Sequence, residues 1–186
     1  RGPLRNGVAV LLTDGEESGL LGARAFIADH PELWREVRVV LNLEARGNRG
    51  PVTMFETSPG ARRLIARLGG ICAYPVAFSF SREIYRRLPN DTDFTVFLKA
   101  GRAGMNFAFV GGLEYYHTAR DTPENLSLRT LQHYGSYLLP LTVAFGQATP
   151  AELDGLQNAG EGTYFPLWRG VLVHYPQTLA SVLAWL

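Results

Sequence analysis

The sequence predicts an α/β fold with a mostly parallel sheet. Short runs rich in Val, Leu and Met indicate buried strands, and they alternate with segments whose apolar residues recur at helical spacing. This alternation is typical of a parallel sheet, because two parallel neighbours need a crossover connection of helical length. At 186 residues the chain suits one domain with a substantial hydrophobic core.

Four short apolar runs are predicted to be strands. They are residues 8–13, 37–43, 52–57 and 105–112. The first run, VAVLLT, shows no apolar–polar alternation, so we expect it to be buried on both faces of the sheet.

Helices are predicted where a capping residue precedes apolar residues at helical spacing. The predicted starts are Ser18, Ser58, Asp91 or Thr92, and Ser127, and the predicted ends are Pro31, Gly69–Gly70, Gly101 and Phe145. Pro140 lies inside the last helix and predicts a kink. Residues 71–90 are predicted to be irregular, since they contain Pro75 and Pro89.

The composition of the last forty or so residues predicts a division of the chain. Residues 146–162 are rich in Gly, Ala and Thr, so we assign 1–146 to the main domain and 147–186 to a linker with an apolar appendage. The final stretch, GVLVHYPQTLASVLAWL, is either an element packed on the protein or the first turns of a membrane span. A complete span needs about 18 consecutive apolar residues, and the sequence has no such run.

The charged residues give no indication of nucleic-acid binding, and the cysteine count excludes an internal disulfide. There are 18 basic and 17 acidic side chains, and Lys99 is the single lysine, so no basic block indicates nucleic-acid binding. Cys72 is the single cysteine, which excludes an internal disulfide.

Acidic, tyrosine and histidine side chains follow three of the predicted strands. Glu16 and Glu17 come after strand 8–13, Glu44 after strand 37–43, and Tyr116 and His117 after strand 105–112. Ligand sites in α/β sheets form beyond the carboxyl ends of the strands, so we expect these side chains to converge. Carboxylates and imidazoles are zinc ligands, and the pattern favours a metal site.

Each of these residues also has a purely structural interpretation. Glu16 and Glu17 precede a helix and would complement its dipole. Glu44 would pair with a nearby arginine, and His117 would be a half-buried histidine beside tyrosines. The spacing alone leaves both interpretations open.

Three segments resemble the co-catalytic zinc aminopeptidase family. DGEESGLLGARAF (14–26) resembles its metal-binding segment, while NLEARG and YYHTARDTPENL resemble its next two ligand segments, in the same order. NDTDFTVF is similar to the stretch between them, and the resemblance spans residues 7–145. Glu44 stands where many secreted members have Asp, which favours the membrane-anchored vacuolar and endoplasmic-reticulum branch. The resemblance implies a three-layer α/β/α fold with a mostly parallel mixed sheet.

The resemblance implies catalytic and substrate-binding roles for three residues. Glu16 would be the general base that takes a proton from water. Tyr116 would donate a hydrogen bond to the oxyanion of the tetrahedral intermediate. Asp93 would lie in the stretch that lines the substrate pocket.

The resemblance also implies the metal ligands. Glu17 and His117 would bind one zinc ion, and Glu44 would bind a second. The family pattern begins earlier, with a His and a bridging Asp, and residues 1–13 contain neither. We therefore expect the site to hold two ions in the intact family protein and none or one in this chain. We also expect the chain to be an inactive fragment that lacks the first strands, with an exposed sheet edge that favours self-association.

The function implied is that of a zinc-dependent exopeptidase, an aminopeptidase acting on peptides. The stretch TYFPLWRGVLVHYP is similar to the segment directly after the peptidase domain in membrane-anchored members, which implies a tethered parent protein with an extracytoplasmic peptidase domain. Two alternatives share the fold: a non-catalytic binding domain, and a glutaminyl cyclase with a single zinc. The retention of Glu16, Glu17, Glu44 and His117 disfavours the first alternative.

Overall fold

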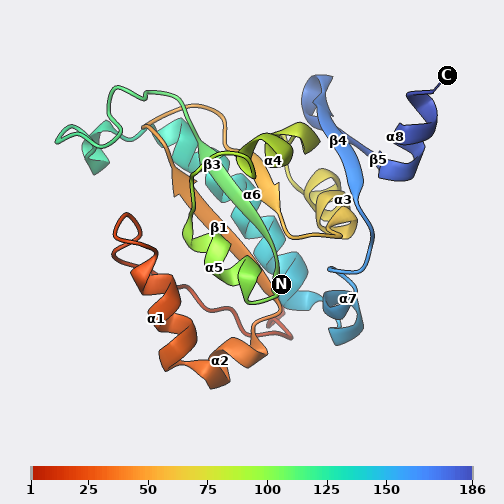
Figure 1. The fold of residues 1–186 in the computed structure, drawn as a ribbon, viewed down its shortest axis with the longest axis horizontal. Helices are drawn as coiled ribbons and strands as arrows, with labels where there is room; N and C mark the ends of the chain where they lie inside the picture. Colours follow the sequence, from red (N-terminus) through yellow and green to blue (C-terminus); the bar gives the residue numbers. More distant parts are fainter. Residues whose placement is uncertain (1, 186) are drawn as a thin grey trace.

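A mixed sheet forms the centre of the molecule. The computed structural model describes residues 2–185, apart from the side chain of Arg169. Its main sheet is three-stranded in the order β1-β3-β2, formed by β1 (Val39–Ala45), β3 (Ala103–Phe109) and β2 (Thr53–Thr57) (Figure 1). β1 is parallel to β3 and β2 is antiparallel to it. The prediction of an α/β fold with a mixed sheet is confirmed.

Helices cover both faces of this sheet. In Figure 1, α5 (Asp93–Lys99) lies in front of the sheet and α6 (Leu128–Gln147) passes behind it. Side chains of β3 point alternately to the two layers. Met105 and Phe107 belong to the larger core with Tyr137 of α6, whereas a Cβ on Gly104 would meet Phe94 of α5 at 2.6 Å. The layers are therefore helix, sheet and helix.

The remaining helices extend these two layers. On the α5 side, α1 (Leu21–Asp29) and α2 (Pro31–Glu36) form a smaller core through Ala23, Trp34 and Phe97. On the α6 side, α3 (Arg62–Ile71) contributes Leu64 and Leu68 to the larger core. Two short elements, α4 (Ser79–Tyr85) and η1 (Pro123–Asn125), lie in the connections.

The prediction of a buried strand at residues 8–13 is wrong for this structure. In the described part of the chain these residues form no strand, and Val10 is 84% and Leu12 90% exposed. A strand is stable only where a neighbour pairs with its backbone. Within residues 2–185, β1 pairs only with β3, and segment 8–13 has no strand beside it.

Helix boundaries differ from the prediction at several places, and one of them is the start of the third helix, which begins at Arg62 and not at Ser58. The first helix begins after Leu20, whose φ is 62°, and has no side-chain cap from Ser18. Pro31 starts α2 instead of only ending α1, because proline is tolerated at the first helical position. The third helix continues through both glycines to Ile71, and α4 lies in the stretch predicted to be irregular. The caps at Thr92 and Ser127 are confirmed.

The final apolar stretch forms a hairpin and a short helix. β4 (Gly162–Leu167) and β5 (Val171–Pro176) are antiparallel and joined by η2 (Trp168–Gly170), and α8 (Gln177–Leu183) follows. Buried Leu172 belongs to the larger core, which agrees with the interpretation of a packed element. Among the helices of residues 2–185, none has the length and apolar character needed to cross a bilayer.

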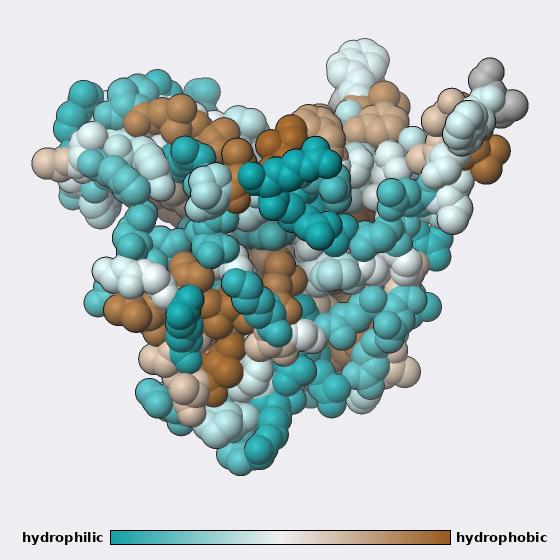
Figure 2. Space-filling model, viewed as in Figure 1, coloured by the Kyte–Doolittle hydropathy of each residue, from teal (hydrophilic) through white to brown (hydrophobic). Residues whose placement is uncertain are grey.

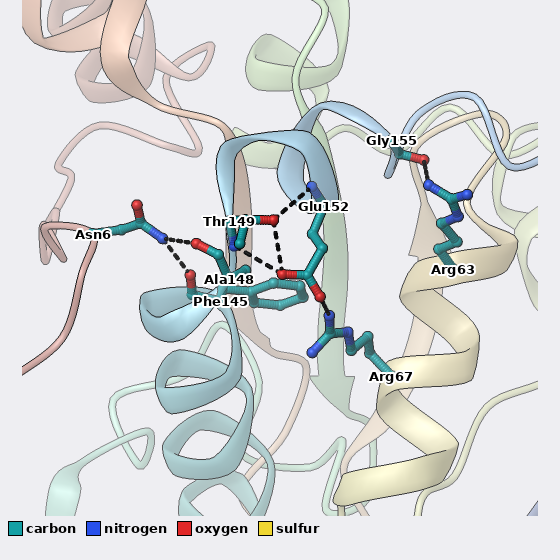
Figure 3. Close-up of polar contacts among 8 residues, drawn as sticks. All are labelled: Asn6, Arg63, Arg67, Phe145, Ala148, Thr149, Glu152 and Gly155. Atoms are coloured by element: carbon teal, nitrogen blue, oxygen red, sulfur yellow. Dashed lines mark hydrogen bonds and ion pairs between the residues drawn. The ribbon is translucent and has the colours of Figure 1, made fainter. Parts of the chain in front are cut away.

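Polar contacts join the N-terminal segment and the segment after α6 to the helices of the main domain (Figure 3). The amide of Asn6 donates to two carbonyl groups at the end of α6, at 2.8 and 2.9 Å. Thr149 and Glu152 form the capping box of α7 (Pro150–Asp154), and Glu152 pairs with Arg67 of α3 at 2.9 Å. The segment predicted to be a linker is thus ordered around a short helix of its own.

Tyr137 provides a test of the packing between α6 and the loop that follows α3. Its buried hydroxyl accepts a hydrogen bond from the Val76 N–H at 2.8 Å and donates to the Tyr74 carbonyl at 2.9 Å. We expect Tyr137→Phe to lower the free energy of unfolding by about 1–3 kcal/mol, because the partly buried Val76 N–H loses its acceptor. Urea denaturation measures this loss. Tyr74→Phe, at an exposed ring, should change stability little, and equal effects would contradict the assignment.

Candidate metal centre

The candidate ligands come from the carboxyl ends of β1 and β3 and from the turn before α1. Glu44 lies near the end of β1, and the loop after β3 carries Tyr116 and His117. Figure 1 shows this loop on the same side of the molecule as the turn that leads into α1. Parallel β1 and β3 end at the same edge, which is why residues far apart in sequence approach one another there.

Glu17 and His117 are in direct contact. Oε1 of Glu17 lies 2.5 Å from Nε2 of His117, although the residues are separated by 100 positions. Both side chains are more than half exposed, so this is an open site and not a core interaction. His117 has a φ of 55°, a left-handed conformation that is uncommon for residues other than glycine and clusters at functional sites. The structure therefore brings together two of the three predicted ligands.

Tyr116 stacks on His117. The two ring centroids are 3.8 Å apart and the planes are 23° from parallel. The Arg46 guanidinium lies 5.7 Å from the centre of the tyrosine ring. Partial burial raises the pKa of the Tyr116 phenol, and the charge of Glu17 raises it further. The phenol consequently stays protonated at neutral pH and can donate a hydrogen bond beside the histidine.

Glu16 and Glu44 lie within electrostatic reach of each other. Burial raises the pKa of Glu44 to about 7, opposed by a hydrogen bond from Asn42 and increased by the charge of Glu16. Burial also raises the pKa of Glu16, as does the neighbouring charge of Glu17. Among the described residues, however, no group of three or more His, Cys, Asp or Glu side chains is close enough to hold an ion. Glu44 is thus near the Glu17–His117 pair but not in contact with it.

The structural interpretations of these residues find less support. The first turn of α1 contains no acidic residue, so Glu16 and Glu17 lie too early to complement that turn directly. Arg49 pairs with Glu114 at 2.8 Å, which leaves Glu44 without that partner. The histidine His133, by contrast, has a structural role, since its ring accepts a hydrogen bond from the Val52 N–H at 3.0 Å.

Asp93 carries a buried oxygen without a partner. It is the first residue of α5 and only 5% exposed, and within the described residues its Oδ1 has no hydrogen-bond partner. Its negative charge raises the pKa of both Glu16 and Glu44, so it belongs to the same acidic region. An unpaired buried carboxylate oxygen is costly, and it indicates that a cation or a donor group belongs nearby.

The donor set fits zinc. The Glu17–His117 pair offers one oxygen and one nitrogen, and Glu44 offers a further carboxylate, which are the ligand types zinc prefers. The neighbouring acids raise one another's pKa, and a divalent cation relieves such repulsion. The orphaned oxygen of Asp93 points to the same need for positive charge.

Sequence reasoning missed the side chains that hold Glu44 in place. Asn42 donates a hydrogen bond to Glu44 Oε1 at 2.8 Å and also contacts Asn106, at the centre of β3. The sequence does carry a signal for Asn42: it precedes Glu44 by two residues, and residues two apart on a strand share a face of the sheet. Asn106 had no comparable signal within its own apolar strand.

The raised pKa of Glu44 predicts a pH-dependent effect of Glu44→Gln in the metal-free protein. Below the unfolded-state pKa of 4.5 the Glu44 carboxyl is neutral in both the folded and the unfolded protein. As pH rises above this value the carboxyl ionises more readily in the unfolded chain, so the folded state loses stability until pH passes the folded-state pKa of about 7. We expect the substitution to stabilise the fold on the order of 1–3 kcal/mol at about pH 8, and to have little effect at about pH 4. Thermal denaturation at the two pH values measures this difference; equal effects at both would contradict the burial of a titrating carboxylate.

Comparison with known proteins gives a consistent result. The model of peptidase family M28 matches residues 1–142. The chain is 26% identical over 97% of its length to "Endoplasmic reticulum metallopeptidase 1" of Rattus norvegicus, and covers 20% of that protein. It is 35% identical over 71% of its length to "Putative endoplasmic reticulum metallopeptidase 1-B" of Caenorhabditis elegans, and covers 15% of it.

A further relative is "Vacuolar membrane protease" of Clavispora lusitaniae, 34% identical over 64% of this chain and covered to 11%. The chain thus spans a fifth or less of the length of these curated relatives. No solved structure matches it. The family match includes the segments that carry all the candidate ligands, and the metallopeptidase relatives lie in the expected membrane branch. This chain belongs to peptidase family M28.

Proposed function

We propose that this chain is part of the catalytic domain of a zinc-dependent aminopeptidase. The observation that carries the proposal is the contact between Glu17 and His117, next to Glu16 and on an open surface. A carboxylate and an imidazole from segments 100 positions apart meet beside a second carboxylate, that of Glu16, which makes no such contact within residues 2–185. This arrangement separates metal binding from proton transfer, as metal-assisted hydrolysis requires.

Glu17 and His117 would hold one zinc ion, and Glu44 would contribute to a second. Zinc, when bound, polarises the peptide carbonyl and makes water more acidic. In the full-length protein we propose two ions. Residues 1–186 alone offer a single candidate ligand to the second ion, so we propose that this stretch binds none or one and is inactive in isolation.

Glu16 and Tyr116 would carry out the protein's own part of the chemistry. Glu16 would accept a proton from the attacking water and return it to the leaving nitrogen, and its raised pKa suits a group that works in both directions. The Tyr116 phenol would donate a hydrogen bond to the oxyanion that develops at the carbonyl. Its stacking on His117 fixes the ring relative to the metal ligand.

The acidic character of the site supports an aminopeptidase over other exopeptidases. A substrate's free α-amino group is positively charged, and Asp93 would accept a hydrogen bond from it through the oxygen that has no partner among the described residues. A substrate carboxylate, by contrast, would be repelled.

We further propose that the parent protein is membrane-associated, with the peptidase domain on the extracytoplasmic side. Residues 162–186 contain no Asp, Glu or Lys. Figure 2 shows apolar surface on the β4–β5 hairpin, just below its pale tip, and on part of α8. Exposed side chains there include Leu167, Val171, Val182 and Trp185. We assign this apolar face of residues 147–186 to the side of the protein nearest the membrane. Self-association, by pairing of a second copy along the outer edge of β1, stays a prediction.

Peptide hydrolysis by the full-length protein tests the proposal. We expect release of the N-terminal residue from a peptide with a free amino group, no release after N-acetylation, and loss of activity with a chelator that added zinc restores. Cleavage of the acetylated peptide at its interior would contradict the aminopeptidase assignment. Cyclisation of an N-terminal glutamine without peptide cleavage would favour a glutaminyl cyclase, and binding without turnover a non-catalytic domain.

A further inference from the structure

A row of polar side chains crosses the sheet on the face covered by α5. It joins Glu44 and Asn42 of β1, Asn106 of β3 and Glu56 of β2. Asn106 is paired in register with Asn42 on one side and with Glu56 on the other, so the three side chains are direct cross-strand neighbours. Asn106 is fully buried and Glu56 nearly so.

Every side-chain N–H in this row has an acceptor. The amide of Asn42 donates to Glu44 Oε1 at 2.8 Å and to Asn106 Oδ1 at 2.9 Å. The amide of Asn106 donates to Glu56 Oε2 at 3.1 Å and to Thr92 Oγ1 at 2.9 Å. Each primary amide has two N–H groups, and all four are therefore satisfied.

The row has a fixed direction. A carboxylate only accepts hydrogen bonds, so Glu56 holds the amide nitrogen of Asn106 on its side and turns the amide oxygen toward Asn42. That oxygen holds one N–H of Asn42, and the other N–H is left for Glu44. A reversed Asn106 amide would place an oxygen against the Glu56 carboxylate.

We propose that Asn106 is a positioning residue for the metal ligand Glu44. Through Asn42 it holds Glu44 Oε1, and so sets the orientation in which the carboxylate meets zinc. The inference rests on the proposed role of Glu44. It explains why a polar residue stands in β3, where every residue is buried and an apolar side chain would need no partners. Outer-shell hydrogen bonds of this kind orient ligands and tune metal affinity.

The test uses the zinc-loaded full-length protein and compares N106D with the double variant N106D/E56Q. N106D replaces the donating amide with an oxygen facing Glu56, which breaks the row with almost no change in volume. In the double variant the introduced amide at 56 donates to the introduced carboxylate at 106, so the contact is restored with opposite direction. Asn42 can still donate to the other oxygen at 106.

We expect N106D to weaken zinc binding about 10–100-fold in competition with a chromophoric chelator, and the double variant to recover most of this loss. The absorption spectrum of the cobalt-substituted protein should change with N106D and return in the double variant. N42A removes the donor to Glu44 and should weaken zinc binding to a similar extent. Because Asn42 is partly exposed, this variant tests the same inference if N106D does not fold. Y137F is the matched control. It removes a buried hydrogen bond in the larger core, on the opposite face of the sheet from the polar row, and should lower Tm without changing zinc affinity.

Two outcomes would overturn the inference and can be told apart. If N106D and N42A lower Tm as Y137F does but leave zinc affinity and the cobalt spectrum unchanged, the row is structural only. E44Q should itself weaken zinc binding. If E44Q leaves zinc affinity unchanged, Glu44 is not a ligand, and the proposed metal centre fails together with the inference.

Discussion

Replacing Glu16 with glutamine is expected to lower peptide turnover by about 10²–10⁴-fold while zinc content stays the same, because general acid–base catalysis contributes an acceleration of this size. Glutamine keeps the volume of the side chain and removes its capacity to take up a proton. Among the described residues Glu16 makes no contact of the kind that joins Glu17 to His117, so its substitution should spare the ligands.

Steady-state kinetics and zinc analysis of the full-length protein measure the two parts of this prediction. We expect the loss in kcat rather than in KM, since Glu16 would act on the reacting water. Glu32→Gln makes the same chemical change on the exposed surface of α2 and should leave turnover unchanged. Normal turnover by the Glu16 variant would exclude it as the base, and loss of zinc from that variant would make it a ligand instead.

Replacing His117 with alanine is expected to remove one zinc ion and nearly all activity. The imidazole is one of two donors in the contact that carries the proposal. We expect zinc affinity at this position to fall more than about 100-fold, beyond the 10–100-fold typical of outer-shell changes. The substitution also removes the ring on which Tyr116 stacks. Catalysis should therefore lose both a zinc ligand and the support that positions the Tyr116 phenol.

Zinc titration with and without the substitution measures this effect. His174→Ala is the matched control, because His174 is an exposed histidine on β5 and has no part in the site. Unchanged zinc stoichiometry in the His117 variant would show that the Glu17–His117 contact is only a surface ion pair. Such pairs contribute little to stability, and the variant would then resemble the control.

The elements predicted well were those whose signals are local. The cap at Thr92 precedes α5 and the cap at Ser127 precedes α6, and both are written in a few adjacent residues. β1 and β3 are mostly apolar segments that find partners within the described chain. Segment 8–13 has an equally apolar sequence but no partner there, and a strand depends on the neighbour that satisfies its backbone.

Helix α4 shows the opposite case, a structure without a local signal. Prolines lie on both sides of it, at 75 and 89. The helix is held by tertiary contacts: Ser81 donates to the Phe55 carbonyl at 3.1 Å, and Tyr85 packs edge-on against the Phe55 ring. Packing against β2 therefore decides a conformation that propensity does not favour.

The candidate site also contains residues that the sequence could reveal and one residue that it could not. The candidate ligands Glu44 and His117 follow β1 and β3, and Glu17 precedes α1; their positions along the chain suggest a site, and the family resemblance assigned them roles. Asn106 lies in mid-strand, and its role exists only because the register places it between Asn42 and Glu56. Register between strands distant in sequence is a tertiary property, so no pattern within residues 103–109 could reveal it.

X-ray diffraction from crystals of the full-length protein, collected at the zinc absorption edge, would locate the metal ions. We expect zinc bound by Glu17 and His117, about 2.0–2.2 Å from each donor atom, with Glu44 on a second ion about 3.5–4 Å from the first. Zinc at another place, with Glu17 and His117 still in direct contact, would contradict the proposed metal centre.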